Sequence, residues 1–138
     1  MGLSVLFLAA AASHAQQSWS GGSAFACHVA YVHDGDTFRC TDGTRIRLSA
    51  IDAPEMPGAC RPGRSCAPGD PYEAKATLER LIYGRTVECQ PTGTTYNRIA
   101  AWCSVGGVDL SCAMLANGEA IRLPRFDPAD RLRSCGAR

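Results

Sequence analysis

The sequence lacks several features that would assign it to a common class. Beyond the first fifteen positions, its 138 residues contain no apolar run long enough to span a membrane. There is no internal repeat and no low-complexity tract. The formal net charge is only +1, which argues against a protein that coats nucleic acid through a global positive field.

Lysine is almost missing, since Lys75 is the only one and the remaining Lys+Arg positions are all arginine. The planar guanidinium suits bidentate contacts to phosphate, although a GC-biased genome is an equally simple explanation for most of these arginines. With 46% hydrophobic residues the chain can build a core, and its length indicates one domain.

The eight cysteines include no Cys-x-x-Cys pair, which argues against a zinc knuckle and a thioredoxin-type redox site. An even number in a small exported domain is typical of a disulfide framework, and many connectivities are open. Between Cys60 and Cys66 the chain is a Pro- and Gly-rich loop, and a disulfide there could close its tip.

The N-terminus has the pattern of a secretory signal peptide. Leu3 to Ala12 is a short apolar run, and Ser13-His14-Ala15 fits a cleavage site before Gln16. We expect a signal peptide over residues 1–15, a flexible lead-in over 16–23 and a folded domain over 24–138. Export to the periplasm or the medium would follow, with no membrane attachment of the mature chain.

Strand-like alternation from Ala24 to Ser49, broken at Asp34-Gly35 and Asp42-Gly43, predicts three short antiparallel strands. A helix is expected from Asp70, its N-cap, to a stop at Gly84. The remaining expected elements are strands at 85–89 and 99–105 joined by PTGTTYNR, a helix over about 109–117, and a short third helix that Asp127-Pro128 could open. Five strands with few crossovers favour a small closed barrel, mainly β or α+β, with two to three helices.

The carboxylates of two stretches could meet at one point. HDGDTFRC places Asp36 just after a turn, and RIRLSAIDAPE places Asp52 and Glu55 where a strand breaks. If the turn lies beside that strand end, the three carboxylates would bind a hard divalent cation such as calcium or magnesium. An arginine beside them could grip a phosphate, whereas the simplest alternative is a set of ordinary surface salt bridges.

Taken together, DGDTF, RIRLSAIDAPE, a helix ending in LIYGR, TTYNRIA and VDLSCAMLANGEA resemble, in this order, the thermonuclease (staphylococcal nuclease-like) family. The resemblance runs from about residue 25 to 121. It implies a five-stranded OB-type barrel with helices. It also implies a calcium-dependent phosphodiesterase that acts on DNA and RNA, breaks the bond between phosphorus and the 5′-oxygen, and leaves 3′-phosphates.

The resemblance also implies roles for particular residues. Asp36, Asp52 and the backbone carbonyl of Ala53 match calcium ligands, and Asp34 matches an acid close to the metal. Glu55 matches the residue that activates the attacking water. Arg47 and Arg98 match the arginines that bind the scissile phosphate, and Tyr96 matches a tyrosine near the terminal phosphate.

The chain departs from the family pattern in places. Asn97 stands where a glycine is usual, and because asparagine tolerates the left-handed backbone, Arg98 could still be aimed correctly. Ala53 replaces a threonine, and after Ala120 the chain lacks a tyrosine that helps to hold the nucleotide, which weakens the case for base stacking.

The implied barrel suggests disulfides between neighbours in the sequence. The pairs are Cys27–Cys40, Cys60–Cys66, Cys89–Cys103 and, tying the tail to the second helix, Cys112–Cys135.

The function expected from the sequence is that of an exported, monomeric, calcium-dependent nuclease acting on single-stranded or flexible DNA and RNA. The chief alternative is a nuclease-like barrel that binds nucleic acid or protein without cutting. Retention of the acids and arginines named above argues against it. A third interpretation is a disulfide-rich structural domain in which the motifs occur by coincidence.

Overall fold

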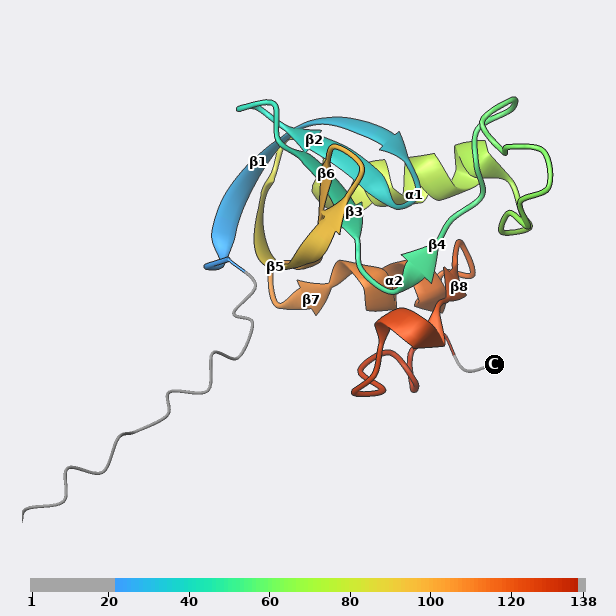
Figure 1. Cartoon of the computed structure of the whole chain (residues 1–138). Coiled ribbons are helices and arrows are strands. Elements are labelled where there is room, and N and C mark those ends of the chain that lie inside the picture. Colours follow the sequence, from blue (N-terminus) through green and yellow to red (C-terminus); the bar gives the residue numbers. More distant parts are fainter. Residues whose placement is uncertain (1–21, 137–138) are drawn as a thin grey trace, which may run out of the picture.

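The fold is described by a computed structural model that covers residues 22–136. The expected signal peptide and nearly all of the lead-in lie outside these residues. Five strands form a closed barrel, hydrogen-bonded in the order β3-β2-β1-β5-β6, and parallel pairing of β3 with β6 completes the circle (Figure 1). These strands are β1 (Phe25–Asp34), β2 (Thr37–Cys40), β3 (Arg45–Leu48), β5 (Thr86–Thr95) and β6 (Arg98–Val105). The predicted OB-like barrel with helices is therefore confirmed.

Three short strands extend this plan. One of them, β7 (Val108–Asp109), pairs with β6 beyond the barrel. The other two, β4 (Ile51–Asp52) and β8 (Ile121–Arg122), pair with each other in a separate two-stranded sheet. The sequence did not predict this second sheet, because two-residue strands carry no periodicity.

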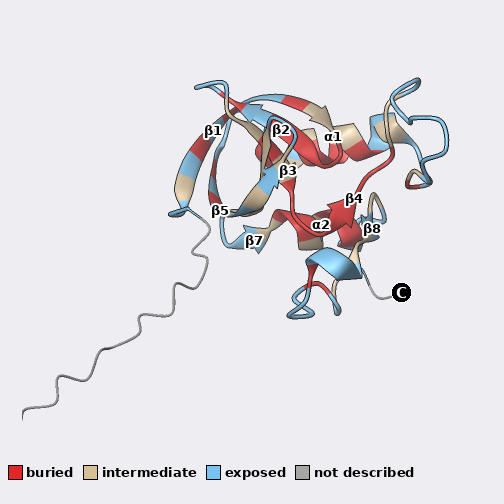
Figure 2. Cartoon of the chain, viewed as in Figure 1, coloured by how far each residue is buried: buried red, intermediate tan, exposed pale blue. Residues whose placement is uncertain are grey.

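Helix α1 (Pro71–Ile82) begins as predicted. The Asp70 carboxylate accepts hydrogen bonds from the backbone N–H groups of Tyr72 (2.8 Å) and Glu73 (3.4 Å), which caps the helix. The chain leaves the helix through Gly84, whose φ of +67° suits glycine. Its buried face packs against β1, so the helix closes one end of the barrel (Figure 2). Helix α1, which Asp70 caps, therefore lies next to the turn between β1 and β2.

Helix α2 (Leu110–Ala116) also matches its prediction, with the Asp109 carboxylate accepting a hydrogen bond from the backbone N–H of Cys112 at 2.9 Å. The predicted third helix at Asp127 is wrong. A short 3-10 helix, η1 (Pro124–Phe126), lies just before it. Buried Asp127 instead accepts hydrogen bonds from the N–H groups of Arg131 and Leu132, and this holds the following residues in turns.

The predicted strand over 85–89 continues further than expected, as β5 runs through PTGTT to Thr95. A register shift between Pro91 and Gly93 accommodates the proline, which cannot donate to a ladder. Only Tyr96 and Asn97 remain to turn the chain into β6. The sequence suggested that Asn97 could take the left-handed backbone conformation at this turn. Tyr96 takes it instead, with φ of +54°.

The four expected disulfides are present. They join Cys27 to Cys40, Cys60 to Cys66, Cys89 to Cys103 and Cys112 to Cys135. Such a framework indicates an oxidising, extracellular environment. Within residues 22–136, no helix has both the length and the apolar character needed to cross a membrane.

Candidate active site

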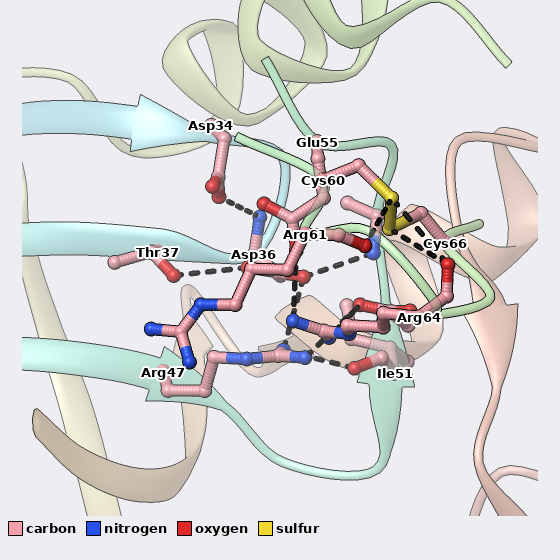
Figure 3. A network of polar contacts seen from close by, with 12 residues as sticks. Asp34, Asp36, Thr37, Arg47, Ile51, Glu55, Cys60, Arg61, Arg64 and Cys66 are labelled. Atoms are coloured by element: carbon pink, nitrogen blue, oxygen red, sulfur yellow. Dashed lines mark hydrogen bonds and ion pairs between the residues drawn. A yellow bond between two sulfur atoms is a disulfide. The ribbon is translucent and has the colours of Figure 1, made fainter. Parts of the chain in front are cut away.

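The candidate site forms where β1, β2, β3 and β4 end or begin side by side (Figure 3). Its centre is the turn between β1 and β2, which carries Gly35 and Asp36. Glycine in a tight turn often takes a positive φ, but Gly35 does not. A Cβ at this position would lie 2.7 Å from the Cβ of Ala74 and 2.8 Å from that of Ala53. Glycine therefore allows the turn to pack closely against α1 and the segment after β4.

Two buried carboxylates, Asp36 and Asp52, share one arginine. Arg47 Nη1 lies 3.0 Å from Asp36 Oδ2, and Arg47 Nη2 lies 3.2 Å from Asp52 Oδ1. Nη1 also donates to the carbonyl oxygen of Ile51 at 2.9 Å. Alternation along one strand would place Arg47 and Asp52 on opposite faces, so their meeting needs a bend. Ala50, with φ of +62°, supplies that bend between β3 and β4.

Asp36 is hydrogen-bonded through both oxygens. Oδ1 accepts a hydrogen bond from Thr37 Oγ1 at 2.9 Å, and Oδ2 accepts one from the backbone N–H of Ala53 at 2.9 Å. The contact that Ala53 makes here is thus through its N–H, whereas the sequence directed attention to its carbonyl. Asp34 supports the turn, because its carboxylate accepts the backbone N–H of Asp36 at 3.0 Å.

The crowding of acids shifts their protonation equilibria. Burial and the nearby charge of Asp36 raise the pKa of Asp52, and Arg47 and Arg64 oppose this effect. Burial, the Asp36 charge and, more weakly, the Glu55 charge raise the pKa of Asp34 to about 7. Such an arrangement favours any additional positive charge that reaches the site.

Arg98 enters the same network from β6. Its Nη1 donates to Thr37 Oγ1 at 3.2 Å, and that hydroxyl in turn donates to Asp36. Burial and the neighbouring charge of Arg47 lower the pKa of the Arg98 guanidinium. Within residues 22–136, Arg98 has no carboxylate partner within 4.0 Å, so it can bind an anion without first breaking an ion pair.

Glu55 is linked to the network through Arg64, a residue that sequence reasoning did not single out. Arg64 Nη1 lies 3.5 Å from Glu55 Oε1, and its Nη2 lies 3.8 Å from Asp52 Oδ1 (Figure 3). Arg64 sits in the loop closed by the Cys60–Cys66 disulfide. The sequence feature that could have indicated this residue is the run RPGR between the two cysteines, which follows the segment carrying Asp52 and Glu55.

The acidic side chains of the site are the possible ligands of a divalent cation. Within the described residues, no three His, Cys, Asp or Glu side chains are placed to bind one ion together. Of the three carboxylates expected to converge, Asp36 and Asp52 contact the same Arg47 guanidinium, and Glu55 is joined to Asp52 through Arg64. Two buried carboxylates that repel each other suit a hard cation. Calcium takes about six to eight oxygen ligands, so backbone and water oxygens would have to complete its coordination.

Tyr96 lies outside this network. The residue is 83% exposed at the turn between β5 and β6, and the Arg61 guanidinium lies 5.6 Å from its ring centroid. Arg47 also lines a cavity of about 620 Å³, which lies between the β5–β6 hairpin and the C-terminal segment. Trp102 and Phe126 line it. The sequence did not predict this cavity, since it depends on the extension of β5 and on the turns after Phe126.

The structure thus gathers Asp34, Asp36, Arg47, Asp52 and Arg98 at one point. A scan against protein-family models and a search of curated proteins both return no match for this chain.

Proposed function

We propose that this protein is an exported, calcium-dependent nuclease that hydrolyses phosphodiester bonds in DNA and RNA. One observation carries the proposal. Two arginines from different strands, Arg47 and Arg98, lie in one polar network with the buried pair Asp36 and Asp52. Guanidinium groups and acids in such proximity suit a reaction in which negative charge develops on a phosphate.

Each side chain has a task that fits its position. Arg98, free of carboxylate partners among the described residues, binds a non-bridging oxygen of the scissile phosphate, and Arg47 binds a second. Glu55 is 21% exposed at the rim, where it can accept the proton of an attacking water. Asp36 and Asp52 would hold the calcium ion, and when bound that ion would neutralise charge on the phosphate. Cleavage at the P–O5′ bond follows from the family resemblance.

The cavity beside Arg47 fits a nucleobase in size and character. Trp102 offers an aromatic surface, and the Arg131 guanidinium lies 4.4 Å from its ring centroid. A base that entered this cavity would place its phosphate near Arg47. Export agrees with the disulfide framework and with the signal-like pattern of the N-terminal sequence, and we propose that the protein acts as a monomer.

The decisive experiment is incubation of residues 16–138 with denatured DNA or RNA, in calcium or in a chelator. We expect cleavage in calcium only, with 3′-phosphate ends. Absence of calcium-dependent cleavage of both substrates would refute the enzyme.

Two substitutions test the roles. Glu55→Gln and Arg98→Lys should each lower the cleavage rate by orders of magnitude. The first removes the proton acceptor, and the second removes the planar guanidinium that can form two hydrogen bonds to a phosphate. The matched controls are Glu88→Gln and Arg133→Lys, which make the same changes at exposed positions outside the site. Melting temperatures should agree among all four variants. If either site variant cuts at the normal rate, the role given to that residue is wrong.

One observation favours a second function, that of a nucleic-acid-binding barrel without catalysis. Arg47 and Arg64 lie within ion-pair distance of Asp36, Asp52 and Glu55 and offset much of the negative charge of these acids. Such a module would bind single-stranded DNA equally well in calcium and in chelator and would leave it intact. The incubation above distinguishes the two functions directly.

A further inference from the structure

The outer face of β1, β2 and β3 carries a group of cations that the candidate site does not use. Tyr31 on β1 pairs across the sheet with Arg39 on β2, and Arg39 pairs with Arg45 on β3. His33 lies two residues beyond Tyr31, with its ring centroid 4.7 Å away, and Lys75 reaches Tyr31 from α1. These five residues are called the basic face below.

The positive charges of the basic face are poorly compensated. Within residues 22–136, Arg39 and Arg45 have no carboxylate within 4.0 Å, and Lys75 has only Glu79 on its own helix at 3.7 Å. Burial, followed by the charges of Arg45, Arg39, Lys75 and Arg98, lowers the pKa of His33. The charges of four cations therefore act on one imidazole. In a chain with a net charge of only +1, this is a marked local concentration.

Tyr31 holds two of these cations in place. The Arg39 guanidinium lies 5.9 Å and the Lys75 ammonium 5.1 Å from the centroid of its ring, which is within cation–π range. Arg45 is oriented separately, because its Nη1 donates to Asn97 Oδ1 at 3.2 Å. Without these contacts, the positive side chains of Arg39, Arg45 and Lys75 would repel one another and move apart. Their positioning on an exposed sheet lowers the entropic cost of binding an anion there.

The basic face continues into the candidate site along each strand. Arg45 precedes Arg47 by two residues on β3, and Arg39 follows Thr37 by two residues on β2, so each pair projects from the same side of the sheet. Two residues of a strand span roughly 7 Å. A nucleic acid strand whose scissile phosphate is bound by Arg47 and Arg98 can therefore place the neighbouring phosphates over Arg45 and Arg39. A further phosphate can lie at Lys75, which shares the Tyr31 ring with Arg39.

We propose that the basic face binds the sugar-phosphate backbone of the single-stranded nucleic acid that enters or leaves the candidate site. The proposal rests on the nucleic-acid substrate of the proposed function but not on cleavage. The guanidinium group of arginine can form two hydrogen bonds to one phosphate. The cations of the basic face also adjoin Arg47 and Arg98, which bind the scissile phosphate in the proposed function. A membrane surface fits less well, because Tyr31 is the only large hydrophobic side chain of this face and is engaged by two cations.

The test compares binding of short and long oligonucleotides in a chelator, where no cleavage interferes. Fluorescence anisotropy would follow single-stranded DNA of four and of twelve nucleotides with residues 16–138. The variant is Arg39→Ala/Lys75→Ala. The control is Arg85→Ala/Arg133→Ala, which removes the same charge elsewhere on the surface.

We expect the Arg39/Lys75 variant to bind the long strand several-fold more weakly and the short strand as well as the wild type does. The slope of log K against log salt for the long strand should fall in magnitude by about 1.4, because each lost phosphate contact removes about 0.7 for a single strand. Arg39→Lys/Lys75→Arg, which keeps both charges, should retain most of the slope.

Several outcomes would overturn the proposal. They are an unchanged salt slope in the Arg39/Lys75 variant, an equal loss in the control variant, failure of the wild type to bind the long strand in chelator, and equally tight binding of polyglutamate. The last would assign the face to acidic proteins. Cleavage without these binding differences would leave the proposed enzyme intact and remove only the basic face.

Discussion

Arg47→Met is the sharpest test of how the candidate site is held together. The Asp36 and Asp52 side chains are only 6% and 7% exposed, and the Arg47 guanidinium contacts both. Methionine keeps much of the aliphatic volume but removes the charge. Two buried carboxylates would then face each other with Arg64, 3.8 Å from Asp52, as the nearest remaining cation.

The expected loss of stability is large. Removal of one partner of a buried ion pair costs about 3–5 kcal/mol, and the residual Arg64 contact favours the lower end of this range. With urea m-values of about 1–3 kcal/mol/M, a loss of about 3 kcal/mol lowers the unfolding midpoint by roughly 1–3 M at neutral pH. The matched control is Arg64→Met, whose side chain is 49% exposed, and it should cost no more than about 1 kcal/mol.

The loss should depend on pH and on calcium. The pKa of Asp52 is already raised in the folded protein, and removal of Arg47 would raise it further. A carboxyl group with a raised folded pKa contributes stability that is full below its unfolded pKa and is lost as pH rises through the folded pKa. The variant should thus be less impaired at pH 5 than at pH 8. If the pair binds calcium, an excess of 100 times Kd should restore about 2.7 kcal/mol.

The assay is urea unfolding followed by circular dichroism at pH 5 and pH 8, with chelator and with calcium. A loss below about 1 kcal/mol, or one of the same size at both pH values, would show that Arg47 does not neutralise a strained carboxylate pair.

Two further predictions concern stability. Gly35→Ala should destabilise the protein by about 1–3 kcal/mol in thermal unfolding, because its Cβ would meet the side chains of Ala53 and Ala74, and a change below 0.5 kcal/mol (about the limit for neutral substitutions) would contradict this packing. Asp127→Asn should cost about 2–4 kcal/mol, because the carboxylate accepts hydrogen bonds from Arg122 and from the backbone N–H of Leu132. Burial alone would raise the pKa of Asp127, but these donors hold it below its usual value, so its stabilisation is present above about pH 3.8 and lost as pH falls through the folded pKa. Acid unfolding of the variant should therefore be less steep than that of the wild type, and an equally steep profile would be evidence against this role.

Local signals predicted much of this fold. The Asp70 cap and the Gly84 stop are local chemistry, so α1 and its bounds could be predicted closely. Period-two alternation predicted β1 to β3. The pairs Cys27–Cys40 and Cys89–Cys103 were suggested by the barrel that the family resemblance implies.

The features that the sequence could not give depend on contacts between distant segments. Gly35 was interpreted through turn chemistry, yet close approach of Ala53 and Ala74 decides it. The bend that joins Arg47 to Asp52 rests on a positive φ at Ala50, a residue type that carries no signal for it. Arg64 could not be predicted as a partner of Glu55, because the path of a proline-rich loop is set by its packing and its disulfide rather than by periodicity.

The four disulfides have a consequence for how the chain is made. They close intervals of 13, 6, 14 and 23 residues, in sequence order, and no bridge encloses or crosses another. As the chain emerges N-terminus first, each cysteine therefore meets its partner before the next pair has appeared. Correct oxidation needs no rearrangement of an earlier bridge, so we expect regain of native disulfides to be limited by the oxidant more than by an isomerase.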